Sequence, residues 1–453
     1  MELTRRRRLV FWVMLAVIAV TLSVAAGEIM LRITYRDGGR TTLAGPGGKS
    51  FEYLFPGAER ARSRRVPDHR TPGVRRLLVF GDSITWGVGV RDWRDVYTSK
   101  LLGLLNTDGR RYDMQVNARP GASVDSYARW AAIEVPRIDP DLVIYQWDAN
   151  DLEIGRPHPT LHRSWRQWPT HPWLMQHSYL YYFLDRRSIQ FLPPRTSFYT
   201  NYLLHSFDEG TTSWAKYRDA FHRWVVYSTA QGAHTLVVLY PQVPFSGENP
   251  LTTLHARMKA LAGRTELRYP AVMFRGEIGE TKADSSVTEG RVRCSHGEAG
   301  ALVGSGPIPL LHGSYDLTVR VRLDSVPSIT NAAIAALDVL VDDEPAASLP
   351  IAVSSFPGTG RWTNLSVRFS VPGALARIRW ELRNVPGTSM SVDTVSMPVT
   401  YPGLAVIDLS ERMNGFDTHT SVFDAHPNES AHQVIAEQLA GWIRAHDRPR
   451  AGS

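Results

Sequence analysis

The chain has 453 residues, of which 43% are hydrophobic and 21% are charged, a balance that argues against long disorder and leaves room for two folded units. Its net charge of +7 comes from arginine, and no nucleic-acid-binding motif accompanies it, so we expect no nucleic acid partner. The single cysteine, Cys294, excludes an internal disulfide and a cysteine-based zinc cluster.

The N-terminus carries a block of arginines at residues 5–8, followed by an uncharged apolar run at residues 9–27. About 20 apolar residues span a bilayer as a helix, and flanking arginines stay cytoplasmic. We therefore predict a cytoplasmic block and a transmembrane anchor over residues 1–31, with the catalytic part on the extracytoplasmic side. A cleaved signal peptide, processed near residues 24–26, is the alternative, and it would release a secreted protein.

A stem or linker is predicted over residues 32–74, between the anchor and the first domain. Arginines cluster at residues 60–76, and we expect this charge to be solvated near the membrane. Attraction to anionic lipid or to an acidic glycan is the alternative.

Five short apolar runs, separated by amphipathic stretches, are typical of a parallel sheet with helices on both faces. The predicted strands are residues 77–80, 114–117, 142–147, 235–240 and 404–409, and the predicted helices are residues 96–105, 127–134, 214–229 and 430–445. The segment 158–203 is rich in Trp, His and Tyr without a clear period. We expect it either to cap the site or to lie near lipid.

The pattern changes to an alternation of polar and apolar residues between about residues 267 and 400. The alternating runs are residues 315–323, 336–341, 362–371 and 376–383. Half-buried antiparallel strands have this pattern, and its repetition predicts an all-β sandwich. The first domain then comprises residues 75–266 and 402–446, and the sandwich, residues 267–401, is inserted into one of its loops.

Two short motifs carry residues suited to catalysis. One places a serine just after a predicted strand, and the other places a histidine just before a predicted helix. Gly-Asp-Ser83 directly follows the first predicted strand, and Asp424-Ala-His426 precedes the last predicted helix. Serine is a poor nucleophile until a neighbouring base takes its proton, and that base works best when a carboxylate orients it. These residue types indicate acyl transfer.

With two further blocks, at residues 117–123 and 148–151, these motifs resemble the SGNH (GDSL-type) hydrolase family of esterases and acyltransferases. The four blocks occur in the family's order, and the resemblance covers residues 75–263 and 404–444. It implies an α/β domain with a flavodoxin-like three-layer fold around a parallel sheet.

The resemblance also implies the roles of individual residues. Ser83 is the expected nucleophile, His426 the base, and Asp424 the carboxylate that orients it. The expected oxyanion hole combines the backbone N–H groups of Ser83 and Gly121 with the side chain of Asn150. We expect no metal and no cofactor.

Two positions depart from the family pattern. Asp148 stands where the third block usually has glycine, and a carboxylate aimed at an oxyanion would oppose catalysis, so we expect it to point away or to be paired. One residue separates Asp424 from His426 instead of the more common two, although residues two apart in an extended segment share a face. Asp417 is the weaker substitute for Asp424. His432 is expected to be structural.

The sandwich resembles carbohydrate-binding jelly-roll modules at the level of pattern. Trp362, Trp380 and Tyr315 either stack on sugar rings or fill the core, and the alternation around Trp380 favours the core for that residue. A spacer or an oligomerisation role is the alternative.

The sequence therefore predicts a membrane-anchored serine esterase that removes acyl groups, expected to be O-acetyl, from a glycan or another ester substrate. An O-acyltransferase that modifies an envelope polysaccharide and a non-catalytic glycan-binding protein are the alternatives.

Overall fold

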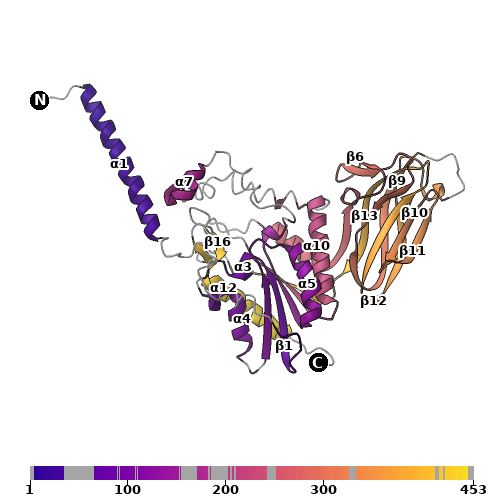
Figure 1. The fold of residues 1–453 in the computed structure, drawn as a ribbon, viewed down its shortest axis with the longest axis horizontal. Coiled ribbons are helices and arrows are strands. Elements are labelled where there is room, and N and C mark those ends of the chain that lie inside the picture. Colours follow the sequence, from indigo (N-terminus) through magenta and orange to yellow (C-terminus); the bar gives the residue numbers. More distant parts are fainter. Residues whose placement is uncertain are drawn as a thin grey trace.

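The computed structural model of the chain describes residues 5–34, 66–88, 90, 92–107, 109, 111–152, 154, 171–181, 184, 203–204, 207–208, 211–241, 251–325, 333–413, 418–421 and 424–446. Three parts can be followed in Figure 1: an N-terminal apolar helix, a domain built on a parallel sheet, and an antiparallel β-sandwich. The predicted arrangement is confirmed at this level.

The parallel sheet consists of β1 (Val74–Gly81), β2 (Arg111–Ala118), β3 (Leu142–Trp147), β4 (His234–Leu239) and β14 (Leu404–Asp408). Their spatial order is β14-β4-β3-β1-β2, and all neighbouring pairs are parallel. Numbered along the chain, this is the doubly wound order 2-1-3-4-5, whose winding reverses between β1 and β3. Sites in such sheets lie at the carboxyl ends of the strands beside that reversal.

Helices cover both faces of this sheet. One face carries α5 (Val124–Ile138) and α10 (Thr212–Thr229), and the other carries α4 (Tyr97–Leu105) and α12 (Glu429–His446), while α11 (Thr252–Leu261) follows β4. Successive residues of a strand point to opposite faces. Accordingly, Phe80 of β1 belongs to the core under α5 and α10, whereas Val79 belongs to the core under α4 and α12.

In the described residues between α11 and β14, the sandwich has nine antiparallel strands. They are β5 (Arg264–Pro270), β6 (Glu280–Ala283), β7 (Arg291–Cys294), β8 (Gly300–Gly304), β9 (Ile308–Ser325), β10 (Ala335–Val341), β11 (Glu344–Ile351), β12 (Trp362–Asn384) and β13 (Ser389–Thr400). The main path of pairing is β11-β10-β12-β9-β13-β7-β6, while β5 pairs with β13 and β8 with β12.

The strand β12 differs from the sequence prediction. Two separate runs, 362–371 and 376–383, are expected, but both belong to one strand, which pairs with β9 from Trp362 to Ile378 and with β8 near its end. The register of this pairing shifts between Val371 and Leu375, where Pro372 and Gly373 stand. Proline has no N–H to donate to a neighbouring strand, and residues in a bulge do not need to donate one. The strand can therefore bend at Pro372 and continue.

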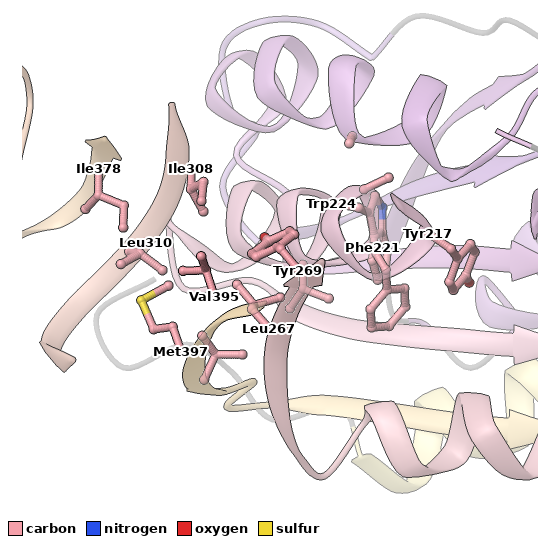
Figure 2. Close-up of a cluster of buried hydrophobic side chains, with 14 of the residues drawn as sticks. Tyr217, Phe221, Trp224, Leu267, Tyr269, Ile308, Leu310, Ile378, Val395 and Met397 are labelled. Carbon is pink, nitrogen blue, oxygen red and sulfur yellow. The ribbon is translucent and has the colours of Figure 1, made fainter. Parts of the chain in front are cut away.

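The sandwich packs on α10 through a continuous apolar core (Figure 2). Phe221 and Trp224 of α10 belong to the same buried cluster as Leu267 of β5 and Met397 of β13. His222 adds polar contacts, because its Nε2 donates to the carbonyl oxygen of Pro309 at 2.8 Å and its Nδ1 lies 3.2 Å from the Tyr401 hydroxyl. The two domains are therefore joined by buried side chains as well as by the chain.

The N-terminal helix α1 (Arg5–Thr34) contains one stretch, Leu9–Ile33, that is long and apolar enough to cross a membrane, and none of its apolar window is buried. A membrane span and a signal sequence both fit this helix. Of the predicted stem, residues 32–34 continue α1, and the chain is described again from residue 66 onwards. There the chain packs on the α/β domain, because Arg70 and Arg75 both pair with Asp141, at 2.6 and 3.3 Å. This end of the basic cluster is paired rather than solvated.

Candidate active site

The loop after β1 places Ser83 at the first position of a short helix, α3 (Ser83–Trp86). Asp82 caps this helix, since its Oδ1 accepts a hydrogen bond from the backbone N–H of Ile84 at 3.0 Å. A Cβ atom on Gly81 would lie 1.9 Å from Thr85 Oγ1, so glycine is required where the strand turns into the helix. The serine hydroxyl is thereby held at the carboxyl end of β1, with 8% of the residue exposed.

His426 lies beside Ser83, although 343 positions separate them in the chain. Its Nε2 is 2.9 Å from Ser83 Oγ. His426 belongs to the short strand β16 (Asp424–Pro427), which pairs with β15 (His419–Ser421). The side chain of Asn428 then caps α12 by accepting from the backbone N–H of Ala431 at 2.9 Å. These local elements fix the backbone that carries the histidine.

The orienting carboxylate remains a prediction. Asp424 lies in the extended segment β16, two residues before His426. Its side chain lies outside what the structure describes. Asp417, the substitute, lies outside the described residues altogether.

Asn150 approaches Ser83 through Asp82. It lies in a 3-10 turn, η3 (Ala149–Leu152), directly after β3, and its Nδ2 donates to Asp82 Oδ2 at 2.9 Å. The same Asp82 oxygen lies 3.3 Å from the Ser83 hydroxyl. A side-chain amide nitrogen carries two hydrogens. One of them is used by Asp82, which fixes the plane of the amide, and a role of the second toward a ligand beside Ser83 remains a prediction.

The loop after β2 carries Gly121, whose φ of +72° is a left-handed conformation that favours glycine. The last pair in the β1–β2 register is Gly81 with Ala118, and the backbone N–H of Arg119 donates to the Gly81 carbonyl at 3.2 Å. The loops that carry Ser83 and Gly121 therefore leave the sheet side by side.

Three acidic side chains gather at this end of the sheet. Asp82 and Asp151 are fully buried, and Asp148 nearly so. Asp151 Oδ2 accepts from the Tyr145 hydroxyl and from the Asp148 backbone N–H, both at 3.0 Å. Burial, together with the charge of Asp82, raises the pKa of Asp151 well above its usual range. Burial also raises the pKa of Asp82, although the donors from Ile84 and Asn150 oppose the rise.

Sequence reasoning did not assign Asp82 and Asp151 a role. Both stand inside quoted motifs. Asp82 directly follows β1, and this position is the signal that could have drawn attention to it, whereas Asp151 stands four residues after the end of β3 and has no such signal. Their burial is a property of the folded chain, which no local pattern reveals. How the Asp148 carboxylate is oriented remains a prediction.

Two further histidines belong to the structure rather than to the site. His432 is buried, and its Nδ1 accepts from the backbone N–H of Tyr97 at 3.1 Å, as expected for a structural role. His255 Nδ1 lies 3.1 Å from both Asp408 Oδ1 and Ser410 Oγ. A catalytic triad places serine and aspartate on opposite ring nitrogens. Here both share Nδ1, so this second cluster does not have triad geometry.

Within the described ranges, one group of side chains has the spacing of metal ligands, and it lies in the sandwich. Glu280, Cys294 and His296 place their ligand atoms within 4.8 Å of one another. His296 Nε2 is already 3.0 Å from the Glu280 carboxylate, so a hydrogen bond accounts for the arrangement. The group is remote in the fold from Ser83.

The three aromatic residues considered for sugar stacking have different surroundings. Trp380 is fully buried and packs edge-on against Phe274, with ring centroids 4.9 Å apart, which confirms its place in the core. Tyr315 stacks on Phe369. Trp362 is half-buried; two arginines lie over its ring, and its Nε1 donates to a serine. Its ring is therefore in contact with charged groups of the protein itself.

Comparison with known proteins adds little to this geometry. No protein-family profile matches the chain, and no curated protein matches it. Solved structures that align include a carbohydrate-binding module of LamC from Zobellia galactanivorans (11% identity, 30% of this chain and 100% of that one, TM-score 0.23). They also include TesA (15% identity, 42% of this chain and 73% of that one, TM-score 0.26). A module from Cellvibrio mixtus aligns at 11% identity over 29% of this chain and 96% of that one, with a TM-score of 0.23. Scores this low carry no argument, and the functional case depends on the site.

Proposed function

We propose that this chain is a serine esterase of the SGNH type, anchored by α1 and acting outside the cytoplasm on acyl esters of a glycan. The observation that carries the proposal is the 2.9 Å contact between Ser83 Oγ and His426 Nε2. Both residues stand at the carboxyl edge of a doubly wound sheet, beside the reversal between β1 and β3, where such sheets place their sites.

The chemistry begins with proton transfer from the Ser83 hydroxyl to His426 Nε2 while Oγ attacks the ester carbonyl carbon. The carbonyl oxygen becomes an oxyanion. The second hydrogen of the Asn150 amide, with the backbone N–H groups of Ser83 and Gly121, would meet this charge. Each such donor is worth about 3 kcal/mol in the transition state.

The tetrahedral intermediate collapses by breaking the bond to the alcohol oxygen, which takes the proton from His426. The acyl group stays on Ser83 Oγ. Water then attacks the acyl-enzyme while His426 accepts its proton, and collapse releases the acid and regenerates the serine hydroxyl. A sugar hydroxyl in place of water would give acyl transfer instead, with the same residues in the same roles.

Support for a carbohydrate substrate comes from the sandwich. An open groove of about 550 Å³ there is lined by Phe274, Arg275, Glu277, Ser305 and Glu381, among others. Charged and hydroxyl groups beside an aromatic ring suit the hydroxyls and apolar faces of sugars. We take acetyl as the acyl group.

The test uses the full chain in detergent with 4-nitrophenyl acetate and an acetylated polysaccharide. Ser83→Ala should abolish hydrolysis, whereas Ser410→Ala, a control that removes another histidine-bonded serine, should not. A fluorophosphonate should label the chain at Ser83. Turnover that persists in a folded Ser83→Ala variant contradicts the proposal, and so does a folded wild-type chain that neither hydrolyses any ester nor reacts with the fluorophosphonate. Acylated product on an added sugar, with less free acetate, identifies a transferase.

A further inference from the structure

The carboxyl-terminal end of α1 is bound by a segment from the middle of the chain. Glu28 of α1 accepts four hydrogen bonds, two on each carboxylate oxygen. Oε1 accepts from Arg32 Nε at 2.8 Å and from the backbone N–H of Tyr179 at 3.0 Å. Oε2 accepts from Ser178 Oγ at 2.9 Å and from the backbone N–H of Leu180 at 2.8 Å. Glu28 thereby satisfies the backbone donors that follow α7 (Pro172–His177).

Further contacts fix the same segment on α1. Arg32 Nη2 donates to the carbonyl oxygen of His177 at 2.7 Å, and its guanidinium lies 5.2 Å from the centre of the Tyr179 ring. A Cβ on Gly27 would lie 3.5 Å from the Leu180 side chain, so that leucine lies against the helix backbone. Among the described residues of α1, Leu31 alone is buried, in the same stretch.

The position of this contact along α1 sets its depth in a membrane. The apolar stretch starts at Leu9, and about 20 helical residues cross the hydrocarbon of a bilayer. Counted from Leu9, the twentieth residue is Glu28. A carboxylate in hydrocarbon is costly unless it is paired. If α1 spans a bilayer whose hydrocarbon begins at Leu9, Glu28 and its four donors lie at the outer end of that hydrocarbon.

The docked segment presents apolar side chains that the described part of the protein leaves largely exposed. Trp173 is 60% exposed and Leu184 is 55% exposed, while Tyr179 and Tyr181 are half-buried. Tryptophan and tyrosine concentrate at the level of lipid headgroups, where a ring with one polar edge is favoured. In Figure 1, α7 lies beside the lower half of α1, outside the α/β domain.

We propose that residues 171–181 and Leu184 lie on the outer surface of the bilayer, held to α1 by Glu28, with lipid as the partner of Trp173 and Leu184; this rests on the proposed anchoring by α1. The energetic reason is that lipid removes this apolar surface from water while Glu28 satisfies the polar backbone. The segment 158–203 is expected either to cap the site or to lie near lipid. For residues 171–181 and Leu184, the proposal favours lipid. The anchor is then a structural part of the protein, which fixes how the α/β domain stands on the membrane.

The test exploits the single cysteine. In a Cys294→Ser background, Trp173→Cys receives an environment-sensitive fluorophore on the full chain in lipid nanodiscs, and Leu375→Cys, 38% exposed in the remote sandwich, is the matched control. We expect the probe at 173 to be quenched by spin-labelled lipid and to have a several-fold smaller iodide quenching constant than the probe at 375. Glu28→Ala should raise iodide access at 173 and leave 375 unchanged.

Equal iodide access at the two positions overturns the proposal. So does a probe at 173 that is shielded from iodide without quenching by spin-labelled lipid, because protein then covers the segment. Circular dichroism of each labelled chain establishes that it is folded, and the readout is independent of any catalytic activity.

Discussion

Replacing Asn150 by alanine tests the proposed oxyanion hole. The amide uses one hydrogen on Asp82 Oδ2, at 2.9 Å, and the proposal assigns its second hydrogen to the substrate oxyanion. One donor to a developing oxyanion is worth about 3 kcal/mol, so kcat should fall by roughly 100- to 1,000-fold. KM should change little, because the ground-state carbonyl carries less charge than the intermediate.

The assay is steady-state hydrolysis of 4-nitrophenyl acetate, with thermal unfolding as a control. Asn150→Asp keeps the shape, removes the donors and sets a carboxylate against buried Asp82, so it should be at least as impaired. If Asn150→Ala retains kcat within about twofold, or loses activity only through KM, the amide does not stabilise the oxyanion and the reasoning fails.

Three further predictions concern stability. Burial lowers the pKa of His222 to about 4 from the ordinary 6.5, so its neutral form stabilises the fold above pH 6.5. That contribution to the free energy of unfolding, about 3 kcal/mol, should disappear as the pH falls towards 4, because the unfolded state then binds a proton that the folded state does not. If the free energies of unfolding of wild type and His222→Gln vary identically with pH, the prediction is wrong. Gly81→Ala forces Cβ against Thr85 and should cost about 1–3 kcal/mol in denaturant titrations, whereas no loss would mean that the turn relaxes. Phe221→Ala leaves a cavity in the core shared by both domains and should cost about 3–5 kcal/mol. Calorimetry should show both domains affected, and a change in one alone would count against a shared core.

Local sequence patterns were enough to locate most of the secondary structure. The run 142–147 begins with three aliphatic residues, and it forms the fully buried central strand β3. The alternation in 336–341 likewise corresponds to β10, with every second residue facing the core. Such patterns are readable because the periods of strands and helices are properties of a few neighbouring residues. They failed at residues 372–375, where proline and glycine signal a turn but the long pairing with β9 keeps one strand.

Local sequence patterns already indicate which residues stand at the ends of the parallel strands, and therefore that Ser83, Gly121 and Asn150 share one edge of a sheet. Tertiary structure alone decided that His426 reaches Ser83, that Asp82 holds the Asn150 amide, and that Glu28 binds the segment after α7. These contacts join positions 68 to 343 residues apart. Their geometry depends on how whole elements pack, because hydrogen bonds require positions accurate to a few tenths of an ångström, and no short pattern encodes that.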